Sequence, residues 1–294
     1  MRKVIIAILI TGLLSLCITF TACTNNSVPT PTAGVEYTIS FNGRYATVTG
    51  YTGSATNIVI SNDYEGVPVT AIGDYAFSDC TSITSVTIPG TITEIGDSAF
   101  ADCKKLTSVT IPETVTTIGD CAFWNCASLA SITIPSSVTK IGTSAFQGCE
   151  NLKNISVSNE NSTYKSIDGN LYTKDGKTLV QYSIGKSDTN FTIPNTVKTI
   201  GICAFTDCHS LTSVTIGNSV TKISIGSFSS CDNLASVTIS GSVSVIDGEA
   251  FAGCRSLTSI HYRDTKAKWD AIHKSYSWDL HTNNYTIIYN YNGQ

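Results

Sequence analysis

The sequence is poor in charge and in the residues that most enzymes use for chemistry. Only 14% of its 294 residues are charged, and histidine occurs four times. It contains no G-x-S-x-G nucleophile elbow, H-E-x-x-H zinc motif, phosphate loop or dinucleotide fingerprint. These absences argue against an enzyme built on any of these motifs. We therefore expect no enzyme activity and no cofactor.

A surplus of basic residues is also missing. The chain has 18 Lys and Arg against 22 Asp and Glu, which gives a formal net charge of −4. A protein that binds nucleic acid needs a basic stripe to neutralise phosphates, so we expect no nucleic-acid partner. Ser and Thr supply much of the polar surface instead, a composition that is common in extracellular β-rich proteins.

The long apolar run is confined to the N-terminus, where residues 1–22 read as a targeting segment. Arg2 and Lys3 precede an apolar stretch over residues 4–20, and "TAC" follows it. A large apolar residue, two small residues and a cysteine resemble a bacterial lipobox, which implies that Cys23 carries a lipid. The expected location is the bacterial cell envelope, with the exported chain anchored by lipid at the cell surface.

Two other interpretations of this segment stay open. An ordinary secretory peptidase would cut after Ala22, but this cut places the bulky Phe20 where a small residue is preferred. The segment would otherwise remain as an uncleaved anchor. Phe20 also differs from the leucine that is usual in a lipobox. Residues 23–34 follow as a flexible polar tether, because Asn, Thr, Ser and Pro dominate them.

An internal repeat of 23 residues governs the rest of the chain. The motif Phe-x-x-Cys recurs seven times in two phased blocks, at Phe77/Cys80, Phe100/Cys103, Phe123/Cys126 and Phe146/Cys149, then at Phe205/Cys208, Phe228/Cys231 and Phe251/Cys254. Other apolar residues keep the same phase within each copy. One copy is too small to bury its own apolar face, so the copies must stack into a solenoid with a continuous core.

Each copy contains a Val-x-Ile step that alternates with Ser or Thr, the period-2 pattern of a strand with one buried face. We predict nine such strands, from Ile58/Ile60 to Ile260/Tyr262. Proline follows four of them, because it cannot continue a strand ladder. We expect the glycine of the following "IG" pair to adopt an unusual backbone angle. A short helical or irregular turn then leads to the next strand.

The pattern L-x-x-V-x-I-P-x-x-V-x-x-I-G-x-x-A-F-x-x-C resembles the BspA-like, or treponemal-type, leucine-rich repeats of bacterial surface proteins. The resemblance implies a right-handed superhelix with a parallel β-sheet on one face and short turns or helical segments on the other. It also suggests an N-terminal cap unit over 35–73, a repeat solenoid over 74–262 and a C-terminal cap over 263–294. Within that cap, we expect Trp269 and Trp278 to cover the last repeat.

The repeat phase breaks once in the middle of the chain, where about residues 158–190 form an insertion. Its two Asp-Gly pairs, at Asp168-Gly169 and Asp175-Gly176, stand between short alternating runs and predict a β-hairpin or a three-strand flap. We expect the flap to project from the solenoid and to offer three tyrosines for contact with a ligand: Tyr164, Tyr172 and Tyr182.

The recurring cysteines are best explained as small buried hydrophobic residues, so we expect Cys103 to react slowly. Occasional disulfides, such as Cys121–Cys126 or Cys203–Cys208, remain an alternative. No metal site is expected, because C-x4-C without nearby histidine matches no zinc spacing. Three of the four histidines lie in the last forty residues among aspartates, and we interpret them as solvated surface residues rather than as a metal or acid–base site.

The outward positions of the predicted strands form a nearly uncharged row of hydroxyls. The predicted binding face contains Ser85, Thr87, Ser108, Thr110, Ser131, Thr133, Ser156, Thr192, Ser213, Thr215, Ser236 and Thr238. Solenoids bind ligands along such extended faces, and a broad shallow surface suits proteins or glycans better than a small substrate. The alternative is that these hydroxyls only keep the sheet soluble.

We therefore expect a non-enzymatic cell-surface protein that binds other macromolecules through its solenoid face. The family resemblance suggests adhesion to host or extracellular-matrix proteins, or to neighbouring cells. Two alternatives remain: a structural scaffold of the envelope or periplasm without an external ligand, and a Ser/Thr ladder that binds ice or glycans.

Overall fold

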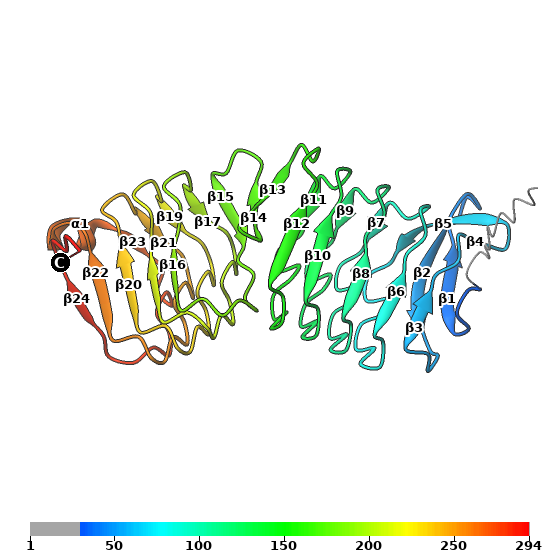
Figure 1. Ribbon diagram of the computed structural model, residues 1–294, viewed down its shortest axis with the longest axis horizontal. Coiled ribbons are helices and arrows are strands. Elements are labelled where there is room, and N and C mark those ends of the chain that lie inside the picture. Colours follow the sequence, from blue (N-terminus) through cyan, green and yellow to red (C-terminus); the bar gives the residue numbers. More distant parts are fainter. Residues whose placement is uncertain (1–29, 294) are drawn as a thin grey trace, which may run out of the picture.

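The computed structural model describes residues 30–293, which form an elongated solenoid whose coils stack along its long axis (Figure 1). The signal segment and the proposed lipidation site Cys23 lie outside the described residues. Each coil contributes one strand to each of two rows that run the length of the molecule. We refer to them as the first strand row and the second strand row.

The first strand row consists of the strands that the sequence predicts, and all nine are confirmed. They are β3 (Asn57–Val59), β6 (Ser85–Thr87), β8 (Ser108–Thr110), β10 (Ser131–Ile134), β12 (Asn154–Val157), β16 (Asn190–Thr192), β18 (Ser213–Thr215), β20 (Ser236–Ile239) and β22 (Ser259–Tyr262). The paired neighbours run parallel and in register, so that Val86 lies beside Val109 and Val214 beside Val237. The row consists of three sheets, because β8 does not pair with β10 and β12 does not pair with β16. A tenth strand, β24 (Thr286–Ile288), pairs with β22 and closes the row.

The second strand row runs along another side of the coils, where the sequence analysis expected no strand apart from those of the flap. Its members are mostly two residues long: β5 (Val67–Ile72), β7 (Glu94–Ile95), β9 (Thr117–Ile118), β11 (Lys140–Ile141), β15 (Thr178–Gln181), β17 (Thr199–Ile200), β19 (Lys222–Ile223), β21 (Val245–Ile246) and β23 (His273–Lys274). The turns between the rows are irregular, and α1 (Lys266–Ala271) is the only α-helix within residues 30–293. Backbone bonds also link these turns, since Phe100 N donates to Ala122 O over 2.8 Å.

The glycines of the "IG" pairs are needed for space, and the expectation that they adopt an unusual backbone angle is wrong. A Cβ on Gly119 would lie 2.6 Å from the backbone nitrogen of Asp97 in the preceding coil. The left-handed backbone instead occurs two residues after each glycine, at φ between 52° and 58° for Tyr75, Ser98, Cys121, Ser144 and Cys203. Close stacking of coils therefore selects glycine at this position.

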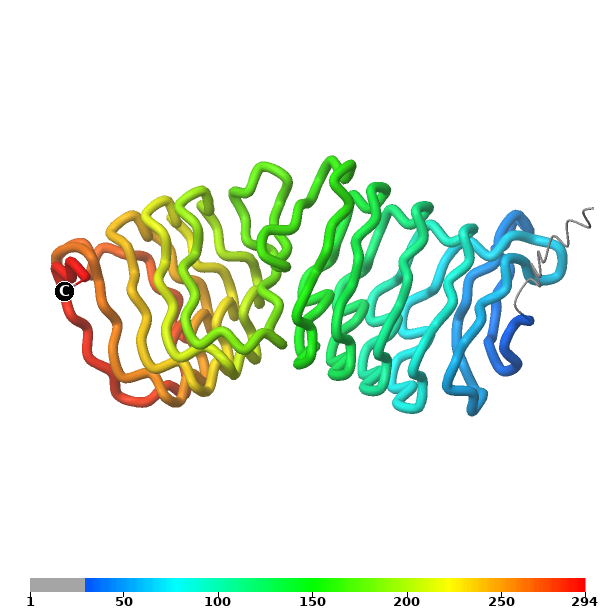
Figure 2. The backbone as a smooth tube through the Cα atoms, in the orientation of Figure 1, coloured from blue at the N-terminus to red at the C-terminus, as the bar shows by residue number. Residues whose placement is uncertain are grey.

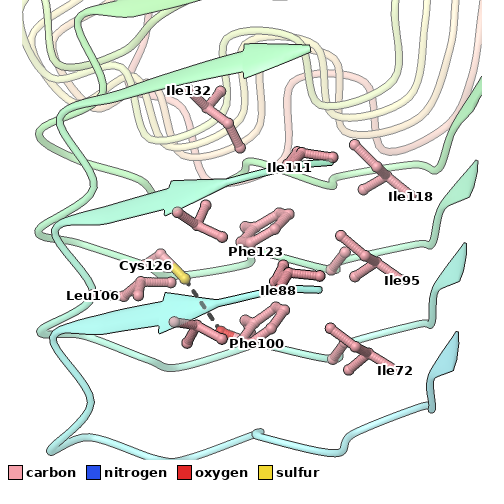
Figure 3. Close-up of a cluster of buried hydrophobic side chains, with 14 of the residues drawn as sticks. Ile72, Ile88, Ile95, Phe100, Leu106, Ile111, Ile118, Phe123, Cys126 and Ile132 are labelled. Atoms are coloured by element: carbon pink, nitrogen blue, oxygen red, sulfur yellow. Dashed lines mark hydrogen bonds between the residues drawn. The ribbon is translucent and has the colours of Figure 1, made fainter. Parts of the chain in front are cut away.

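The phenylalanines of the repeat form a stacked column through the core (Figure 3). Ring centroids of Phe77 and Phe100 are 5.2 Å apart with nearly parallel planes, and those of Phe100 and Phe123 are 5.3 Å apart. All are buried, together with the isoleucine columns on either side. Beyond the insertion, Tyr182 takes the place of phenylalanine and stacks on Phe205 with centroids 4.9 Å apart.

The insertion divides the solenoid into two stacks with separate hydrophobic cores. Its strands β13 (Tyr164–Ile167) and β14 (Asn170–Thr173) form an antiparallel hairpin at Asp168-Gly169, and β14 pairs antiparallel with β15. The predicted three-strand arrangement is therefore confirmed. Figure 2 shows it between the two stacks of coils. Neither strand row is continuous across it, because β11 ends one sheet and β15 belongs to another.

A small cavity of about 160 Å³ marks this break, lined by Ile141, Phe146, Leu171, Val180 and Ile202 among others. One unpaired backbone group at the free edge of β11 finds a partner there, since the N–H of Ile141 donates to the hydroxyl of Tyr164 over 3.0 Å.

Both ends of the solenoid are covered. At the N-terminal end, β1 (Val35–Ile39) and β2 (Ala46–Tyr51) form an antiparallel hairpin, β2 pairs with β5, and β4 (Asp63–Tyr64) adds to the outer edge of β5. At the C-terminal end, Trp269 and Trp278 are buried, and Trp278 packs edge-on against Phe251 with centroids 5.9 Å apart. The expected role of the two tryptophans is thus confirmed.

Candidate functional site

The hydroxyl-bearing residues of the solenoid fall into two groups that the sequence does not separate. One group binds the neighbouring coil: the hydroxyls of Thr93, Thr116 and Thr139 each donate to the backbone carbonyl of the residue 23 positions earlier, over 3.2 to 3.4 Å. Thr107 does the same with Thr84 over 3.1 Å. These threonines hold the coils together, and their hydroxyls are not free to bind a ligand.

The second group is exposed and unbonded. Thr87, Thr110 and Thr133 point outward from β6, β8 and β10, all three are exposed, and their hydroxyls make no hydrogen bond to any of residues 30–293. Ser108 and Ser131 share both properties. Adjacent strands are about 4.8 Å apart and alternate residues of one strand about 6.6 Å, so these groups form a regular grid of donors and acceptors.

Other members of the predicted binding face are less available to a ligand. The hydroxyl of Ser85 donates to Asn57 Oδ1 over 2.8 Å, that of Ser213 donates to Asn190 Oδ1, and Ser156 accepts a bond from Asn154 Nδ2 over 2.7 Å. Thr192 is exposed, whereas Thr215 and Ser236 are half-buried.

Thr238 is buried, with 9% of its surface exposed, so its assignment to the binding face is wrong. Its neighbour on β22 is His261, whose ring stacks against that of Tyr291 with centroids 4.3 Å apart. The C-terminal segment therefore closes this end of the sheet, and the open part of the face lies on β6, β8 and β10.

The three tyrosines assigned to ligand contact do not serve that purpose. Tyr172 and Tyr182 are completely buried, and Tyr164 is 9% exposed. Tyr182 fills a position of the aromatic column and Tyr164 satisfies the edge of β11, so all three belong to the interior. The prediction failed because the flap folds onto the ends of the two stacks and does not project from them.

The cysteine column is a structural feature. The nine cysteines within residues 30–293 are free thiols, so the structure contains neither disulfide considered above. The thiol of Cys126 donates to the carbonyl of Phe100 over 3.1 Å, as Figure 3 shows, and Cys103 bonds Phe77 in the same way. Burial raises the pKa of Cys103 to about 12, which keeps its thiol neutral and unreactive.

The histidines of the cap do not come together. His261 stacks on Tyr291, and the only histidine near a carboxylate among the described residues is His209, whose Nδ1 lies 3.8 Å from Asp232 Oδ2. Within residues 30–293, no group of three His, Cys, Asp or Glu side chains is placed to hold a metal ion. Over the same residues, no helix is long and apolar enough to span a bilayer.

A row of aspartates is one feature that the sequence analysis missed. Asp74 Oδ1 accepts the backbone N–H of Asp97 over 2.8 Å, and Asp97 Oδ1 accepts that of Asp120 over 2.7 Å. The sequence contains a pattern that could have revealed this row, because an aspartate follows three successive "IG" pairs. These carboxylates link one coil to the next, as the bonded threonines do.

Comparison with known proteins shows which family the chain matches. The sequence profile of the BspA type leucine rich repeat region matches residues 70–175 and 181–278, in six copies. A search of curated proteins found no significant match.

Solved structures are similar as well. A leucine-rich repeat protein from Eubacterium ventriosum is 27% identical, with a TM-score of 0.61, and the match covers 80% of this chain and 71% of that one. The pneumococcal vaccine antigen PcpA is 19% identical with a TM-score of 0.54, covering 79% of this chain and 81% of the other. At that identity PcpA shares the fold alone.

Proposed function

Because the chain belongs to the family of BspA-type leucine-rich-repeat proteins, we propose that it is a non-catalytic binding protein of the bacterial cell surface. It would use the open part of its first strand row to contact proteins or glycans of host tissue or of neighbouring cells. A lipid on Cys23 would anchor it to the membrane. The tether predicted over residues 23–34 would hold the solenoid away from that membrane by the part that precedes Thr32, because Thr32 bonds to Val59 of β3.

The observation that supports this proposal is the contrast between bonded and free hydroxyls. Thr93 and Thr116 are explained by the coil they bind, but the packing of the solenoid does not use the hydroxyls of Thr110 and Thr133. Thr87 and Thr110 stand in register on the paired strands β6 and β8, and Thr133 stands on the next coil. Exposed groups on successive coils offer several weak polar contacts to one extended partner, which is the way solenoids bind.

The test uses a double variant of the full chain, Thr110→Lys with Thr133→Lys. The control variant carries Thr81→Lys, in an exposed loop before β6. Binding to immobilised extracellular-matrix proteins and to whole cells is measured. We expect the double variant to bind at least about tenfold more weakly, because two bulky charges cover the grid, and the control to bind like the wild type. Equal binding of all three proteins would contradict the proposal.

A structural scaffold of the envelope remains the second candidate. The two are separated by adding protease to intact cells. A surface adhesin is degraded under these conditions, whereas a periplasmic scaffold is protected until the outer layer is permeabilised.

A further inference from the structure

A polar pocket lies at the C-terminal end of the first strand row, beyond the exposed hydroxyls. Its volume is about 710 Å³, and its lining includes Asn218, Ser242, Arg263, Asp264, Asn290 and Tyr291. These residues come from three successive coils and from the segment that follows β24. The pocket is an open, shallow hollow, wide enough for one or two sugar rings that stay partly in contact with solvent.

An aromatic surface stands at one side of this pocket. The ring of Tyr291 stacks on that of His261 at an interplanar angle of 17°, and both side chains keep part of their surface exposed. Backbone bonds position this segment, because Tyr291 N donates to Tyr262 O over 3.1 Å and Asn290 N donates to Asp264 O over 2.9 Å. A positioned aromatic face attracts the weakly positive C–H groups on the apolar side of a sugar ring.

The other side of the pocket offers planar polar groups. Arg263 Nη1 donates to Asn218 Oδ1 over 3.4 Å, which orients the guanidinium and the amide beside each other. Both side chains, and that of Asn290, are exposed to solvent. The remaining N–H groups of Arg263 and the amide N–H groups of Asn218 are donors suited to sugar hydroxyls or to a carboxylate.

The charges of the pocket favour an anion. Asp264 is already compensated, because its two oxygens accept bonds from Lys268 Nζ and Thr265 N, over 2.7 Å and 2.8 Å. Within residues 30–293, Arg263 forms no ion pair with a carboxylate. Its guanidinium is therefore the uncompensated charge, and a carboxylate is the partner whose planar geometry it matches best.

We infer that this pocket binds a sugar residue that carries a carboxylate, with the ring on Tyr291 and the carboxylate on Arg263. The site is separate from the open hydroxyl face on β6, β8 and β10. Binding of an acidic saccharide in this pocket therefore does not depend on the function proposed above, and either proposal can fail without the other.

The inference is tested by titrating the full chain with methyl glucuronide and, separately, with methyl glucoside, while amide shifts are followed by NMR. We expect saturable shifts of residues around the pocket, with tighter binding of the acidic sugar. Tyr291→Ala should weaken the binding of glucuronide about tenfold or more, and Arg263→Gln should remove the preference for glucuronide over glucoside.

Two matched controls lie away from the pocket: Tyr276→Ala, at a fully exposed tyrosine, and Arg255→Gln, at an exposed arginine. Both should bind glucuronide like the wild type. The inference is overturned if neither sugar gives saturable shifts, if Tyr291→Ala binds unchanged, or if the preference for the acidic sugar survives Arg263→Gln. The melting temperature of each variant shows whether a loss of binding reflects unfolding.

Discussion

The two stacks on either side of the insertion share one repeat but differ in their surfaces. Residues 30–157 contain eleven acidic and five basic residues, whereas residues 158–293 contain eleven of each. At the position after "IG", the first stack has Asp74, Asp97 and Asp120, and the second has Ile202. Ile225 takes the equivalent position after "IS", and both isoleucines are exposed. The scaffold thus depends on the buried positions, and the outward positions are free to specialise.

The separate cores predict that the two stacks unfold as separate cooperative units, and substitutions in the aromatic column should show this with the largest effect. Phe123→Ala removes a buried ring from the first core and should lower the free energy of unfolding by about 3–5 kcal/mol. Hydrogen exchange read by mass spectrometry should then show lost protection across residues 46–157.

The matched variant is Phe228→Ala, in the second core. It should affect residues 182–278 in the same way and leave the first stack protected. If either variant exposes both stacks equally, the insertion does not separate two cooperative units.

A substitution at the glycine where two coils touch should have the next largest effect on stability. In Gly119→Ala, the new methyl group lies 2.6 Å from backbone atoms of the preceding coil, so the coils must separate locally. We expect a loss of about 1–3 kcal/mol in urea denaturation.

The control is Gly90→Ala, since a Cβ there meets nothing within 4 Å. It should change stability by less than about 0.5 kcal/mol. Equal effects at the two positions would refute the steric explanation.

Substitutions in the aspartate row should have the smallest effect on stability. They test directly the difference between the two stacks at this position. Asp97→Ala removes the acceptor for the N–H of Asp120 and should cost about 0.5–1.5 kcal/mol. The backbone N–H of Ile225 lacks such an acceptor within the described residues. Ile202→Asp should therefore transfer the bond to the second stack and raise its melting temperature. A lower melting temperature would show that Ile202 is needed where it lines the cavity at the break.

The first strand row was predictable because its signal repeats with every copy. Val109 and Ile111 alternate with polar residues, and the same alternation recurs every 23 residues. The second strand row was missed because two residues, such as Thr117–Ile118, are too few to show a period. The hairpin was found through its Asp-Gly pairs, yet the burial of Tyr172 and Tyr182 was not, because local turn chemistry does not say what a flap packs against.

The sequence by itself determined the repeat length, the buried columns and the stacking of coils, since one 23-residue copy cannot bury its apolar face alone. The tertiary structure decided which polar groups remain available. Thr116 and Thr110 are the same residue type in the same repeat, but one faces a carbonyl of the preceding coil and the other faces solvent. The pocket of Arg263 and Tyr291 likewise exists only after three coils and the C-terminal segment meet. A hydroxyl or guanidinium acquires a role from the atoms within hydrogen-bond reach, and stacking brings those atoms from residues distant in the chain.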